Sequence, residues 1–222
     1  MNVENAAYVD AGNLASFVSA LPALHQSDIL DSTLLAQLAA DKKYSRFDET
    51  GRWQEVYTST LGQLYWYITS FSHRQHVPTE AMFSLEDLVL DSLRKIATVA
   101  ELSLVKETIG RFKALSDDDK RVLVYAEFTH SGRVVDLQVS VADRSSRQGS
   151  VSIVFETDQE IMRNLFEEKF CVAELVGEIR IWSMIVTLNE ESYEKIRQNV
   201  IDKLGSKRDS LILSLYNNGD AQ

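Results

Sequence analysis

The sequence has little of several residue types that would point to a special class of protein. Cys171 is the only cysteine among 222 residues, so no internal disulfide can form and nothing indicates an oxidising compartment. Two prolines and nine glycines are few for this length, which argues against long flexible linkers. Apolar residues make up 45% of the chain, enough for a core that needs no disulfide or metal. We expect one compact domain.

Positive charge is also scarce. The chain has 23 Lys and Arg against 33 Asp and Glu, a net charge of −10, and the acidity is spread over both halves. A protein that neutralises phosphate groups needs a basic face. We therefore expect no nucleic-acid partner, and a membrane surface is disfavoured without being excluded.

Familiar catalytic and cofactor motifs are missing as well. The sequence contains no G-x-G-x-x-G, no P-loop and no G-x-S-x-G, and its four histidines are scattered. His73 and His76 lie three residues apart, but no carboxylate or cysteine follows at metal-ligand spacing. We expect no metal and no cofactor, the catalytic residues stay unknown, and enzymatic activity is disfavoured.

Long uninterrupted apolar runs are absent too. The most apolar window, residues 170–188, contains Glu174, Glu178 and Arg180, which are too many charges for a membrane-spanning helix. The first residues show neither a basic segment nor an apolar segment of the kind found in signal peptides. We expect a cytoplasmic protein, or one exported without an N-terminal signal peptide.

The same window is the most informative stretch that is present. Its odd positions, from Cys171 to Ile185, are nearly all apolar or small, as one buried face of a long β-strand requires. Cys171 would then be a small buried hydrophobe. The even positions are charged at first and become apolar from Trp182 onward. We predict a central strand whose second face is partly open and partly covered.

Helical spacing dominates residues 1–120. It predicts helices over residues 14–21, 29–40 and 52–74, and capping patterns predict further helices after Ser84 and after Thr98. The helix over residues 52–74 is distinctive because its apolar stripe is widened by aromatic residues.

From residue 121 the apolar spacing changes to two. Strands are predicted over residues 122–128, 135–141 and 151–155, and helices after Thr157 and Asn189. Residues 209–216 fit either a strand or a helical turn, and residues 217–222 a disordered tail. The predicted fold is α+β: a helical region (1–120) on a mainly antiparallel sheet of four or five strands (121–216), in the order β-β-β-α-β-α with a possible last β.

The less apolar sheet face is the surface on which a binding site is predicted. The candidate binding residues are Glu174, Glu178, Arg180, Trp182 and Met184. Alternation on the neighbouring strands adds Asp136, Gln138, Ser140, Ser152 and Glu156. A solvent-facing sheet with cross-strand ion pairs is the alternative interpretation.

Three functional hypotheses remain open at this stage. The first is a non-enzymatic interaction or assembly protein that binds itself, or a protein or apolar partner, through the sheet face or the aromatic helix. The second is an enzyme or small-ligand-binding protein with a cleft at Glu174, Glu178 and Arg180. The third is a membrane-active effector or toxin that releases the aromatic helix into lipid.

Overall fold

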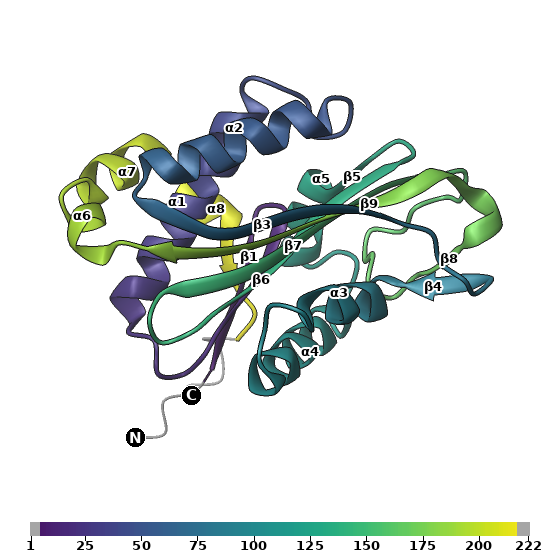
Figure 1. The fold of residues 1–222 in the computed structure, drawn as a ribbon, viewed down its shortest axis with the longest axis horizontal. Helices are drawn as coiled ribbons and strands as arrows, with labels where there is room; N and C mark the ends of the chain where they lie inside the picture. Colours follow the sequence, from purple (N-terminus) through teal and green to yellow (C-terminus); the bar gives the residue numbers. More distant parts are fainter. Residues whose placement is uncertain (1–4, 217–222) are drawn as a thin grey trace.

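Eight strands form one mixed sheet in the computed structural model, which describes residues 5–216 (Figure 1). Their order is β10-β1-β2-β6-β7-β9-β3, with the short β5 beside β6. The pairing of β2 with β6 is parallel, and the other pairings are antiparallel. The strands are β1 (Ala6–Asp10), β2 (Asn13–Phe17), β3 (Trp66–His76), β5 (His130–Ser131), β6 (Val134–Ala142), β7 (Arg147–Thr157), β9 (Leu175–Leu188) and β10 (Ile212–Ser214). A separate small sheet pairs β4 (Met82–Ser84) with β8 (Lys169–Cys171).

Helices cover both faces of the large sheet (Figure 1). One face packs against α3 (Leu85–Leu93), α4 (Val99–Lys113) and α5 (Lys120–Thr129), and this interface is an apolar core. The other face packs against α1 (Ala23–Asp41), α2 (Thr50–Gln63) and the region of α6 (Glu190–Glu194) and α7 (Arg197–Leu204). The short α8 (Lys207–Leu211) leads into β10. Among the described residues no helix has the length and apolarity that crossing a bilayer requires.

The predicted fold class is wrong in its sheet. The prediction was a small antiparallel sheet beneath a helical N-terminal half, whereas the sheet has eight strands and β1, β2 and β3 come from that half. Residues 14–21 were predicted to be helical because Leu14, Phe17 and Leu21 have helical spacing. Every residue of β2 is buried, however, so this strand lacks the alternation that would reveal it.

The predicted aromatic helix is in fact a helix followed by a strand. α2 ends at Gln63, and Tyr65 adopts a positive φ of 64°, which turns the chain back into β3. Trp66 and Tyr67 favour extended structure, so the aromatic residues that widened the predicted stripe mark the turn and the strand.

Residues 122–128 form a helix although a strand was predicted. The buried residues Val122, Tyr125, Ala126 and Thr129 have the spacing of one helical face, and the Asp119 carboxylate caps the helix by accepting from the Arg121 amide. Alternate apolar residues had suggested the strand. A helix that is buried over much of its surface can satisfy both patterns.

Two further predictions differ in detail. The segment after Thr157 is an irregular loop in which the Glu168 carboxylate accepts hydrogen bonds from Gln159 and from the Met162 amide. The stretch 170–188 is divided into β8 and β9 by the 3-10 turn η1 (Val172–Glu174), and Cys171 is half-buried.

Several local predictions are confirmed. Ser84 caps α3, Thr98 and Glu101 form a capping box on α4, and Asn189 caps α6. The predicted last helix is present as α6 and α7, and α7 ends at Gly205, whose φ is 52°. Residues 209–216 contain both alternatives, the end of α8 and β10. The tail 217–222 lies outside the described residues.

Candidate functional site

The sheet face beneath α1 and α2 is polar at its centre. Strand register places one polar row across four strands, made of Asp10, Asn13, Asp136, Gln138, Ser140 and Ser152, with Trp182 and Arg180 on β9. The side-chain amide of Gln138 donates to the Tyr57 hydroxyl of α2 over 3.2 Å. Much of the face that the sequence predicted as less apolar is therefore covered by this chain's own helices.

Hydrogen bonds fix α1 to the turn between β1 and β2. The Thr33 hydroxyl donates to the Asp10 carboxyl over 2.6 Å, and the Gln37 amide donates to the Asp10 backbone carbonyl over 3.0 Å. Gln37 in turn accepts from the backbone N–H of Gly12 over 3.1 Å. A Cβ at Gly12 would overlap the Arg46 guanidinium, so this close approach requires glycine.

Two carboxyl groups in this layer are fully buried. Burial raises the pKa of Asp10 to about 8, against the hydrogen bond from Thr33, which lowers it. Burial likewise raises the pKa of Asp136 to about 7, although the charges of Arg46 and Arg180 oppose the shift. At neutral pH the folded chain therefore keeps Asp10 largely protonated, which makes the packing of α1 and α2 sensitive to pH.

Several polar atoms of this layer have no hydrogen-bond partner in the described part of the chain. They are Asp10 Oδ1, both side-chain polar atoms of Asn13, Gln54 Nε2, Asp136 Oδ2 and Ser140 Oγ. Each such atom costs about 1–3 kcal/mol of desolvation that no hydrogen bond offsets. The polar layer is thus a less stable interface than the apolar core on the opposite face.

The predicted binding residues occupy different environments. Glu174 lies in η1 and Glu178 on β9, and both are exposed, whereas Arg180 is half-buried and reaches the Thr50 hydroxyl at the start of α2. Trp182 is 9% exposed and stacks on His73 at 4.5 Å, and Met184 is 6% exposed within the core beneath the helices. Trp182 and Met184 are therefore not available to dock a partner in this fold. The cleft at Glu174, Glu178 and Arg180 stays a prediction.

The outer edge of β3 is the surface that the sequence did not reveal. β3 is the last strand of the sheet, and among residues 5–216 no strand pairs with its outer side. Tyr67, Ile68 and Phe71 of β3 are 58%, 43% and 50% exposed, and Val77 and Met82, which follow β3 in the chain, are exposed as well. The only sequence signal for it was the β-favouring run of Trp66 and Tyr67.

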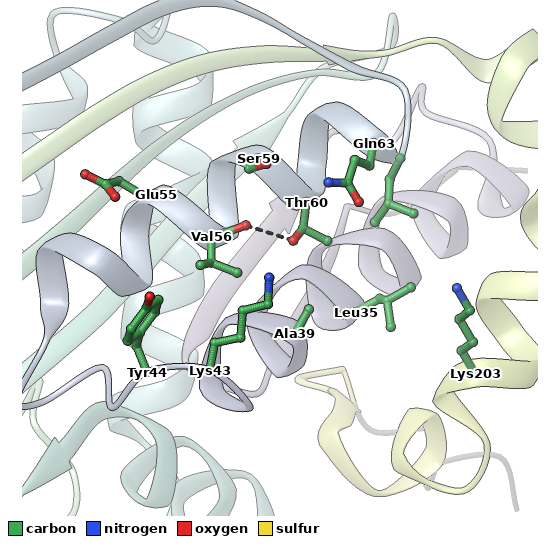
Figure 2. A pocket seen from close by; sticks show the side chains of 11 residues that line it. Leu35, Ala39, Lys43, Tyr44, Glu55, Val56, Ser59, Thr60, Gln63 and Lys203 are labelled. Carbon is green, nitrogen blue, oxygen red and sulfur yellow. Dashed lines mark hydrogen bonds between the residues drawn. The ribbon is translucent and has the colours of Figure 1, made fainter.

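A surface cavity of about 480 Å³ lies between α1 and α2 (Figure 2). Leu35, Ala39 and Val56 supply apolar lining, and the side chains of Lys43 and Lys203 bring amino groups to it. The Thr60 hydroxyl donates to the Val56 carbonyl of its own helix. The lining contains neither histidine nor cysteine, and we assign no reaction to this cavity.

Metal ligation has no support in the described residues. Within residues 5–216 no group of three or more His, Cys, Asp or Glu side chains is placed to hold an ion.

Comparisons with known proteins show no family. No family model matches the sequence, and no curated protein matches it. The structure of the Evf virulence factor is similar with a TM-score of 0.42 and 10% identity, over 84% of this chain and 75% of that one. A delta-endotoxin is similar with a TM-score of 0.43 and 14% identity, over 80% of this chain and 83% of that one. These TM-scores are too low to carry a functional argument.

Proposed function

We propose that the protein is a non-enzymatic interaction protein that binds an extended polypeptide segment as an added strand on β3. The observation that carries this proposal is the position of β3 at the end of the sheet with exposed apolar side chains along it. In an antiparallel pair, every second residue of an edge strand directs its N–H and C=O away from the sheet. These groups are the partners that an extended chain requires.

The two edges of the sheet differ in a way that supports this role. β10, at the other edge, has three residues, whereas β3 has eleven. Natural proteins blunt long edges with charged residues, proline or bulges. β3 contains no proline and a single lysine or arginine, Arg74, and its one protective feature is a bulge between Ile68 and Ser70.

The exposed side chains match the same role. Tyr67, Ile68 and Phe71 lie on one half of β3, and the register places Ile68 and Phe71 beside Val186 and Met184 of the core. A bound strand would extend this apolar surface at the sheet edge. Trp182 and Met184 of β9 are buried, so the proposed binding surface lies on the neighbouring strand β3, where side chains are exposed.

The test is the binding of a strand-forming probe. A fluorescein-labelled peptide of alternating threonine and valine, with a lysine at each end, should bind saturably by fluorescence anisotropy. Ile68→Lys with Phe71→Lys should weaken binding about 10-fold or more, because lysines on an edge oppose strand addition. The matched control is Leu24→Lys, whose position is exposed and belongs to α1 instead of β3. Equal binding by all three proteins would refute the proposal.

A further inference from the structure

The bulge in β3 determines which of its side chains share a face. Ile68 pairs with Val186 and Ser70 with Ile185, so Thr69 is the extra residue. As a result Ile68 and Phe71, three residues apart, both lie on the face that α1 and α2 cover, beside Val186 and Met184. Tyr67 and Ser72 lie on the opposite face, beside Thr187 and Ser183.

We infer that the strand added to β3 is β3 of a second copy of this chain, running antiparallel, with Ile68 of each copy opposite Phe71 of the other. This inference rests on the proposed function and names the partner. Antiparallel strands keep a constant sum of paired residue numbers, so the same register places Tyr67 opposite Ser72 and Thr69 opposite Ser70. The two copies are then related by a two-fold axis perpendicular to the sheet. The sheet face that α1 and α2 cover in one copy therefore adjoins the same face of the other copy.

The sheet faces on which these side chains lie agree with this register. Ile68 and Phe71 share one face, and Tyr67 and Ser72 share the other, so both of these opposed pairs point to a common side. The two Ile68 and Phe71 pairs lie about the two-fold axis and cover side chains that are 43% and 50% exposed in the single chain. Aromatic and β-branched residues are favourable cross-strand pairs.

The bulge also makes β3 self-complementary in this register. Without the extra residue Thr69, Ile68 and Phe71 would lie on opposite faces, and a two-fold axis between Thr69 and Ser70 could not pair them. A second copy carries the same extra residue, and in this register Thr69 and Ser70 of one copy lie opposite Ser70 and Thr69 of the other. The irregularity is therefore matched in the middle of the interface.

Charge is compatible with this arrangement. Arg74 is the only lysine or arginine of β3, and β3 contains no carboxylate. Its guanidinium donates to the Ser92 hydroxyl of α3 over 2.9 Å. In the proposed register Arg74 lies opposite Tyr65, so the two Arg74 residues are about 30 Å apart at the usual strand rise. At physiological salt that distance exceeds the screening length of about 8 Å, and like charges do not meet.

Cysteine cross-linking tests the register. In a Cys171→Ser background, Ile68→Cys and Phe71→Cys chains are prepared separately and mixed under mild oxidation. Opposed residues have Cβ atoms about 5 Å apart, whereas a residue and its own copy lie about 10 Å apart, beyond disulfide reach. We expect a disulfide-linked dimer in the mixture and little in either chain alone. Cross-linking of one chain with itself, or none in the mixture, would overturn the register.

Native mass spectrometry tests the partner separately from strand addition. The unmodified chain should form a dimer, and Ile68→Lys with Phe71→Lys should weaken it about 10- to 100-fold, because two apolar pairs are replaced by lysines that face an apolar strand edge. Leu24→Lys should leave the dimer intact. A monomer that still binds the threonine-valine peptide would overturn the second copy while leaving the proposed function standing. A dimer that survives both lysine substitutions on β3 would show that the copies meet elsewhere and would overturn this inference.

Discussion

Asp10→Asn should remove a large part of the pH dependence of this protein's stability. Burial raises the pKa of Asp10 to about 8, whereas an aspartate in an unfolded chain titrates near 4. Between these values the folded chain binds the proton and the unfolded chain does not, so the free energy of unfolding falls as pH rises from about 4 to about 8. Above about pH 8 the carboxyl group is ionised in both states, and the loss stops.

The size of the effect follows from the number of pH units crossed. Each unit in this window changes the free energy of unfolding by about 1.4 kcal/mol, so the step from pH 5 to pH 7 costs the natural protein about 3 kcal/mol through Asp10. Asparagine stays neutral, and its side-chain oxygen can still accept the hydrogen bond from Thr33. Asp136 is present in both proteins, so its similar contribution cancels from the comparison.

Urea denaturation at pH 5, 6 and 7 provides the assay. The difference in unfolding free energy between Asp10→Asn and the natural protein should shift by about 3 kcal/mol in favour of the variant across this range. Asp118→Asn is the control for the same carboxyl-to-amide change at a surface position, because the Asp118 side chain is 95% exposed. A difference for Asp10→Asn that is constant from pH 5 to pH 7 would show that Asp10 is already ionised in the folded chain.

Two further substitutions probe the helical layer. Arg197→Ala should lower the free energy of unfolding, measured by urea denaturation, by about 3 kcal/mol. The substitution leaves the buried Asp28 carboxylate of α1 without the guanidinium that contacts it at 2.6 Å. A loss below about 1 kcal/mol would contradict this prediction. Met184→Glu should destabilise the fold by more than about 4 kcal/mol, because Met184 lies in the core. If circular dichroism gave the variant the melting temperature of the natural protein, Met184 would be accessible and the prediction would be wrong.

The strands that could be predicted from sequence are those whose two faces carry different kinds of side chain. β6, β7 and β9 alternate because their two faces meet different surroundings, an apolar core on one side and a polar layer on the other. The caps at Ser84, Thr98 and Asn189 could be predicted because capping depends on residues within one turn.

The rest depended on contacts that are distant in sequence. β2 is buried on both faces between β1 and β6, so its residues carry no alternation. The polar row around Gln138 could be predicted, but its cover of α1 and α2 could not, because the packing of Tyr57 on Gln138 joins residues 81 positions apart. The edge position of β3 likewise follows from its pairing with β9 and from the order of the whole sheet.

Residue-resolved amide exchange along β3 tests the central claim of strand addition most directly. In the dilute, unliganded chain, alternate amides of β3 should exchange rapidly because their N–H groups point away from the sheet. Adding the threonine-valine peptide, or raising the protein concentration, should slow those amides while β10 exchanges as before. Unchanged exchange along β3 under both conditions would contradict the account.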